Sequence, residues 1–238
     1  VQTCALPIYM IGSEATGLYA VSYKFPNLMD TVYGFFYQSW KESSARVLGG
    51  ESQDEFYNSV YKYLKNFLFS IVLGMIAFMP IVFRILINKN YYSAIYYVPI
   101  LLLATYFANI SGFYGGIFTA YKDTKIMGTT TVVAAIINLG VNIAMIRIFG
   151  IYAAAISTLV ANFTVYIYRR IKVGKYIKLK ENWKKRTVAV IVCVLIFVVF
   201  YVQNTISIVL GCIVSIMYAL IANYKIIGLI FQKLVKRN

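Results

Sequence analysis

The sequence contains no histidine, three cysteines and only eight acidic residues among 238. Without histidine, a Ser-His-Asp triad, a histidine metal site and an imidazole pH switch are excluded. The cysteines, Cys4, Cys193 and Cys212, show no CxxC or other metal-ligand spacing. The P-loop, dinucleotide-binding and nucleophile-elbow motifs are also missing. We therefore expect no metal, no cofactor and no enzymatic chemistry.

Charged residues are scarce as well, at 13% of the chain against about 25% in an ordinary soluble domain. Hydrophobic residues reach 61%, and the mean hydropathy is +0.71. An open sheet exposed to lipid would leave backbone groups without partners, which argues against strands. The composition predicts an all-α integral membrane protein, a polytopic bundle of transmembrane helices.

Seven apolar segments are long enough, or nearly so, to cross a bilayer core, which takes roughly 20 helical residues. They lie at about 17–39, 66–87, 95–119, 127–146, 151–168, 187–202 and 205–224. We expect five of these helices to form one bundle over residues 9–170. A basic loop at 171–186 then leads to two additional helices and a basic tail in 187–238.

The 23 basic residues are distributed unevenly between the two sides of these spans. Nineteen fall in alternate loops and the tail, nine of them between Arg169 and Arg186. The opposite loops hold Arg84, Lys89 and Arg147, and Lys24 lies inside the first span. This asymmetry predicts that the basic loops and the C-terminus are cytoplasmic. Because topology accounts for the net charge of +15, we expect no nucleic-acid partner.

The first eight residues, VQTCALPI, resemble the in-frame translation of a common sequencing adapter. We therefore expect 1–8 to be artificial and to carry no biology, Cys4 included. On this interpretation the gene was cut upstream, and the sequence is the C-terminal part of a longer protein. The alternative is an octapeptide that belongs to the protein.

Small residues recur at every fourth position of the third span. These are Ala104, Ala108, Gly112, Gly116 and Ala120. Such a stripe lets another helix backbone approach closely, so we expect helix packing here. A second interpretation is that the helices slide along this stripe during transport.

Two charged residues, Lys24 and Asp30, lie within the first span on either side of Pro26. Charges at membrane depth are costly and tend to face a cavity or a partner. The Lys24 ammonium suits an anionic substrate group such as a pyrophosphate, and the Asp30 carboxylate could exchange a proton or hold a sodium ion. The alternatives are partner charges outside this sequence, or snorkelling of Lys24 to the interface.

Four amides also fall inside predicted spans, namely Asn109, Asn138, Asn142 and Asn162. Asn138 and Asn142 are one helical turn apart. Hydrogen bonding between helices is one role for such side chains. Lining a polar cavity of the size of a sugar is the other.

Several segments resemble one family of membrane transporters. The run GLYAVSYKFPNL from Gly17 and the loop RVLGGESQDEFYNSVYKYL from Arg46 are similar to polysaccharide-biosynthesis flippases of the Wzx type. The runs YYSAIYYVPILLLATYFANISGFYGGIFTAY from Tyr91 and RIFGIYAAAISTLV from Arg147 extend the likeness. These flippases belong to the multidrug/oligosaccharidyl-lipid/polysaccharide (MOP) exporter superfamily.

The resemblance implies two six-helix bundles with two extra helices, of which the seven spans here correspond to helices eight to fourteen. It further implies translocation of an undecaprenyl-pyrophosphate-linked oligosaccharide across a bacterial inner membrane by alternating access, coupled to an ion gradient. The partners would be membrane lipid, the lipid-linked oligosaccharide and the missing N-terminal half. Lys24 lies in the signature region, so the resemblance extends a cavity role to it.

Three other functions stay open. A multidrug or cation antiporter of the same superfamily would favour carboxylates in its cavity, whereas one Lys accompanies one Asp here. A lipid II flippase is a close relative of the Wzx type. A membrane-embedded polysaccharide polymerase would need acidic or His/Arg-rich extracytoplasmic loops, and the loops predicted on that side are only a few residues long.

Overall fold

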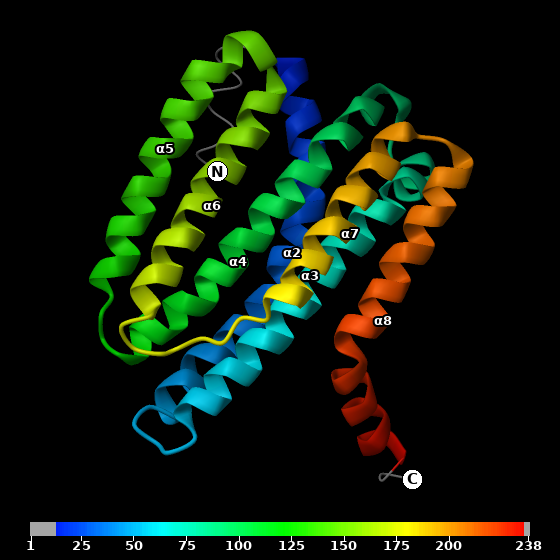
Figure 1. Cartoon of the computed structure of the whole chain (residues 1–238). Helices are drawn as coiled ribbons and strands as arrows, with labels where there is room; N and C mark the ends of the chain where they lie inside the picture. The colour runs from blue at the N-terminus through cyan, green and yellow to red at the C-terminus, as the bar shows by residue number, and fades with distance from the viewer. Residues whose placement is uncertain (1–12, 236–238) are drawn as a thin grey trace.

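The computed structural model describes residues 13–235, so the expected artificial segment 1–8 lies outside the described residues. All regular structure in the described range is helical, as predicted (Figure 1). The helices are α2 (Ser13–Arg46), α3 (Gln53–Leu86), the 3₁₀ helix η2 (Lys89–Tyr97), α4 (Val98–Ala120), α5 (Lys125–Phe149), α6 (Ile151–Val173), α7 (Trp183–Val202) and α8 (Thr205–Val235).

Each of the seven expected spans corresponds to one long helix. Six segments are both long and apolar enough to cross a membrane, and α2 falls outside that group. It is 34 residues long, but Lys24, Asn27 and Asp30 interrupt its apolar sequence. The short sixth span is α7, which ends where Gln203 adopts the left-handed conformation, with φ 55°. The chain is a multi-pass membrane protein.

The connections alternate between the two ends of the bundle (Figure 1). The α2–α3, α4–α5 and α6–α7 connections lie at the same end as the C-terminal end of α8. Basic residues gather in these connections or in the helix ends beside them, so the fold has the alternation that the charge distribution predicts. Which end faces the cytoplasm stays a prediction.

The core lies around α4, which α2 and α6 flank and which also contacts α3. Helix α5 packs on α6, while α7 and α8 pack on α3. Of the apolar windows of α5 and α7, only 11% is buried within the chain, against 61% for the segment that includes α4. The outer helices therefore offer their apolar side chains to lipid or to protein beyond this sequence.

Two glycines of α4 receive aromatic side chains of α2. The Tyr33 hydroxyl lies against Gly112, and the Trp40 indole lies against Gly116. The Trp40 Nε1–H donates to the Phe113 carbonyl at 2.9 Å, and its ring stacks on Phe113 with centroids 4.4 Å apart. Because a glycine has no side chain, the indole reaches the α4 backbone directly.

Replacement of Gly116 tests this close approach. A Cβ at Gly116 would collide with the indole of Trp40, which is 2% exposed and cannot swing away. We expect Gly116→Ala to lower the free energy of unfolding by about 1–3 kcal/mol through overpacking. The matched control is Gly140→Ala in α5, where nothing lies within 4 Å of the added carbon. Thermal unfolding in detergent measures both, and equal midpoints for the two variants would refute the packing.

Candidate functional site

The exposed face of α2 carries polar side chains within the first predicted span. Lys24, Asn27, Thr31 and Gln38 lie on this face at helical spacing and are exposed, and we call them the α2 polar stripe. The opposite face holds Phe25, Met29, Tyr33 and Trp40, all buried against the core. The helix therefore docks its aromatic side on the bundle and turns outward a lysine and amides, which lie among the exposed apolar side chains Leu28, Val32 and Phe35.

Asp30 lies on the flank of α2 between these two faces. The residue is partly exposed, and its carboxyl lies beside the side chain of Asn109 on α4. Asn109 is 5% exposed, and its Nδ2 donates no hydrogen bond to any described residue. The structure thus brings Asp30 and Asn109 together. Along α2, Asp30 lies more than one helical turn from Lys24.

The other three amides lie elsewhere in the bundle. Asn138 on α5 donates its Nδ2–H to the Thr158 hydroxyl on α6 at 3.3 Å. Asn142, one turn further along α5, is 3% exposed, and its Oδ1 is unpartnered among the described residues. Asn162 on α6 donates to the Ala104 carbonyl on α4 at 3.1 Å. Two of these amides thus join neighbouring helices, and none contacts Lys24.

A buried arginine was missed in the sequence. Arg169 is 8% exposed and lies in the last turns of α6, because this helix continues past residue 168 to Val173. Its Nε and Nη2 donate to the Thr130 hydroxyl at 3.0 and 2.7 Å. Its Nη1 donates to the Ser111 carbonyl at 3.1 Å. Since Arg169 opens a run of nine basic residues, composition alone assigns it to the loop.

No carboxylate neutralises Arg169 among the described side chains, where the recorded ion pair is Lys65–Glu181. Tyr33 and Tyr37 of α2 are its electrostatic neighbours instead. Removing a guanidinium from water is costly, and neutral oxygen atoms offset that cost less well than a carboxylate does. Burying Arg169 therefore lowers the stability of the fold. Its guanidinium lies near α2, the helix that carries the polar stripe.

This cost predicts the direction in which substitutions of Arg169 change the stability of the fold. Methionine has a similar length and no charge, so we expect Arg169→Met to keep or raise the midpoint of thermal unfolding. Arg169→Ala also removes the charge but leaves a cavity, and should unfold at a lower temperature than Arg169→Met. Both are measured on the purified chain in detergent. Equal losses in the two variants would mean that the guanidinium contacts themselves stabilise the bundle.

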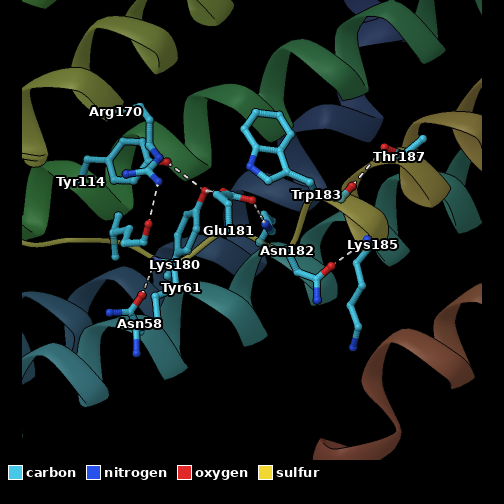
Figure 2. Close-up of polar contacts among 12 residues, drawn as sticks. Asn58, Tyr61, Tyr114, Arg170, Lys180, Glu181, Asn182, Trp183, Lys185 and Thr187 are labelled. Atoms are coloured by element: carbon cyan, nitrogen blue, oxygen red, sulfur yellow. Dashed lines mark hydrogen bonds and ion pairs between the residues drawn. The ribbon is translucent and has the colours of Figure 1, made fainter.

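A second polar cluster holds the α6–α7 connection against α3 (Figure 2). Glu181 accepts from the Lys65 ammonium at 2.7 Å and from the Tyr61 hydroxyl at 2.5 Å. Tyr61 in turn accepts from the Tyr114 hydroxyl of α4 at 3.1 Å. Glu181 thus meets residues 116 and 120 positions away in the sequence, at the end of the bundle where the basic loops gather.

Burial alone raises the pKa of Glu181, but its hydrogen bonds and nearby cations outweigh this effect. The Lys65 and Tyr61 hydrogen bonds lower the pKa, as do the positive charges of Lys65 and Arg170, and the net result is a pKa below the ordinary value. A lowered pKa in the folded state contributes stability above the pKa of the unfolded chain, about 4.3. That contribution is lost as the pH falls through the folded pKa.

Glu181→Gln tests this linkage. We expect the variant to unfold at a lower temperature than the parent at pH 7, because the charged partner of Lys65 is removed. As the pH drops below about 4, the parent should lose this advantage and the two midpoints should converge. The measurement is thermal unfolding at several pH values. A difference between the two that stays constant from pH 7 to pH 3 would exclude Glu181 as the titrating group.

A groove of about 110 Å³ lies between α5 and α6, lined by Thr129, Thr130, Val133, Thr164, Val165 and Tyr168. The three threonine hydroxyls donate to carbonyls of their own helices, so the groove offers little unused polarity. Ligand pockets are typically about 300–1,000 Å³. This groove is too small to enclose an oligosaccharide.

Comparison with known proteins adds evidence for the fold. No protein-family model and no curated protein sequence matches the chain. Among solved structures, the chain is similar to "Lipid II flippase MurJ, inward closed conformation", with a TM-score of 0.69 and 16% sequence identity. The match covers 94% of this chain and 50% of that one, so the chain spans about half the length of its structural neighbour.

At this identity the likeness concerns the fold. The described helices follow the arrangement of one half of a membrane transporter, which confirms the predicted fold class. The narrower Wzx assignment stays a prediction. The chain shares the all-helical fold of the matched part of that structure.

Proposed function

We propose that the chain is the C-terminal half of an inner-membrane flippase for undecaprenyl-pyrophosphate-linked oligosaccharides in cell-surface polysaccharide synthesis. The observation that carries the proposal is the α2 polar stripe, an outward lysine with amides within the first predicted span, on a helix docked in a fold similar to that of a flippase. A charge in this position is costly unless water, substrate or protein covers it. The described residues of this chain leave Lys24 exposed. In the proposed full-length protein, the N-terminal half would complete a hydrated cavity around Lys24.

The chemistry of the stripe suits the head of a lipid-linked sugar. The Lys24 ammonium would neutralise pyrophosphate oxygens through charge-assisted hydrogen bonds. Asn27, Thr31 and Gln38 could exchange hydrogen bonds with sugar hydroxyls. The isoprenoid tail would remain in the bilayer. Asp30, exposed beside Asn109, is our candidate for coupling the cycle to a proton or sodium gradient.

Fewer asparagines remain candidates for lining a cavity than the sequence suggested. Asn109 stays a candidate because it lies beside Asp30. Asn138 and Asn162 are committed to neighbouring helices, so we assign them to packing between α4, α5 and α6. We likewise assign Gly112 and Gly116 to the docking of α2.

A lipid II flippase is the second candidate, because the solved structure with a similar fold carries that name. Lipid II also carries a pyrophosphate, so the same role of Lys24 would serve both substrates. The two candidates differ in the sugar, which the polar residues of the stripe and the absent half would recognise. Transport assays with both substrates separate them.

Lys24 gives the direct test in the full-length protein, reconstituted with the lipid-linked oligosaccharide or with lipid II. Loss of a charge-assisted contact of about 1.5–3 kcal/mol should slow Lys24→Ala by roughly 10–100-fold. Lys24→Arg keeps the charge and should retain a larger share of the flux. The matched control is Lys62→Ala, an exposed lysine on α3 away from the stripe.

The outcomes separate the hypotheses. Loss in Lys24→Ala with either substrate supports phosphate recognition, and the substrate that is transported identifies the flippase. Wild-type flux in both Lys24 variants at equal expression would show that Lys24 does not contact phosphate. A deficit in Lys62→Ala of the same size would point to a general effect of lost charge.

A further inference from the structure

In the connection between α6 and α7, the basic side chains face outward and the acidic side chain faces the bundle. We call residues 174–186 the basic strap. Its exposed side chains include six cations: Lys175, Lys178, Lys180, Lys184, Lys185 and Arg186. The inward side chains are Ile177 and Leu179, at 2% and 8% exposed, and Glu181. The single acid of the strap is therefore turned away from its outer surface.

Hydrogen bonds to the backbone fix this arrangement (Figure 2). Asn58 of α3 donates to the Lys178 carbonyl at 3.2 Å and accepts from the Lys180 N–H at 2.6 Å. Arg170 donates to the Leu179 carbonyl at 2.9 Å. Successive side chains of an extended segment point to opposite sides. Holding the backbone at 178–180 thus buries Leu179 and turns Lys178 and Lys180 outward.

The strap ends where α7 enters the apolar part of the protein. Trp183, the first residue of α7, is 69% exposed, and the Arg186 guanidinium lies over its ring at 5.0 Å. Tryptophan in such a position is typical of the boundary between hydrocarbon and headgroups. The exposed cations at 178–186 therefore lie at the level of the lipid headgroups on this side.

We propose that the basic strap is a preformed binding surface for anionic phospholipid headgroups. Headgroup phosphates supply the negative charge that the outer surface of the strap lacks, and Trp183 fixes the depth at which they meet it. The clamp through Asn58, Arg170 and Glu181 orders the surface before any lipid arrives, which reduces the entropy lost on binding. The proposal does not depend on which substrate the protein transports.

The test uses the two tryptophans of the chain, Trp40 and Trp183. The chain is reconstituted into phosphatidylcholine vesicles that hold a minor fraction of brominated phosphatidylglycerol or the same fraction of brominated phosphatidylcholine. Bromine quenches nearby indoles. The quenching seen with Trp183→Phe, which retains the buried Trp40, is subtracted to leave the signal of Trp183. We expect brominated phosphatidylglycerol to quench Trp183 about twofold more strongly, and high salt to remove the excess.

Two triple variants locate the surface. Lys178→Gln/Lys180→Gln/Lys185→Gln should abolish the preference for phosphatidylglycerol. The matched control Lys41→Gln/Lys62→Gln/Lys125→Gln removes three exposed cations from the same end of the bundle and should retain the preference. The salt comparison needs no variant, so the test holds even where a variant folds poorly. Equal quenching by the two lipids, or a preference that survives in the strap variant, would overturn the proposal.

Discussion

The docking of α2 on α4 is the contact on which the candidate site depends. Tyr33 and Trp40 reach the α4 backbone because Gly112 and Gly116 leave room for them. With this face committed to the bundle, the helical period turns Lys24, Asn27 and Thr31 to the opposite side. The outward position of these polar side chains is thus a consequence of packing as much as of composition. Their exposure within a predicted span is the reason for proposing a covered, hydrated cavity in the full-length protein.

Charge is arranged differently at the two levels of the bundle. Between the packed helices, Arg169 bonds neutral oxygens of Thr130 and Ser111. At the end where the basic loops gather, Glu181 is paired with Lys65 and holds an ordered strap of cations. The first arrangement is costly for folding, and the second stabilises it. In a chain with a net charge of +15, the inward-facing Glu181 thus organises a basic surface, whereas the buried Arg169 has no carboxylate partner among the described side chains.

The sequence predicted the parts of the structure that follow from periodicity and composition. Span positions, alternation of the basic loops and the fold class are in this group, because lipid imposes helices of a certain length and loops carry the charge. The spacing of Gly112 and Gly116 indicated close packing but not that α2 is the partner. Arg169 was missed because it opens a basic run. The Glu181–Lys65 pair joins residues 116 apart, a distance at which no local pattern operates.

Solvent access to α2 in the full-length protein tests the central claim most directly. Single cysteines replace Asn27, Thr31 and, as the buried control, Met29, in a background in which every native cysteine, Cys4, Cys193 and Cys212 included, is alanine. A membrane-impermeant maleimide should label positions 27 and 31 but not 29, and the lipid-linked oligosaccharide should slow that labelling. If positions 27 and 31 react only with a lipid-soluble reagent, the stripe faces lipid, and that result would contradict a cavity.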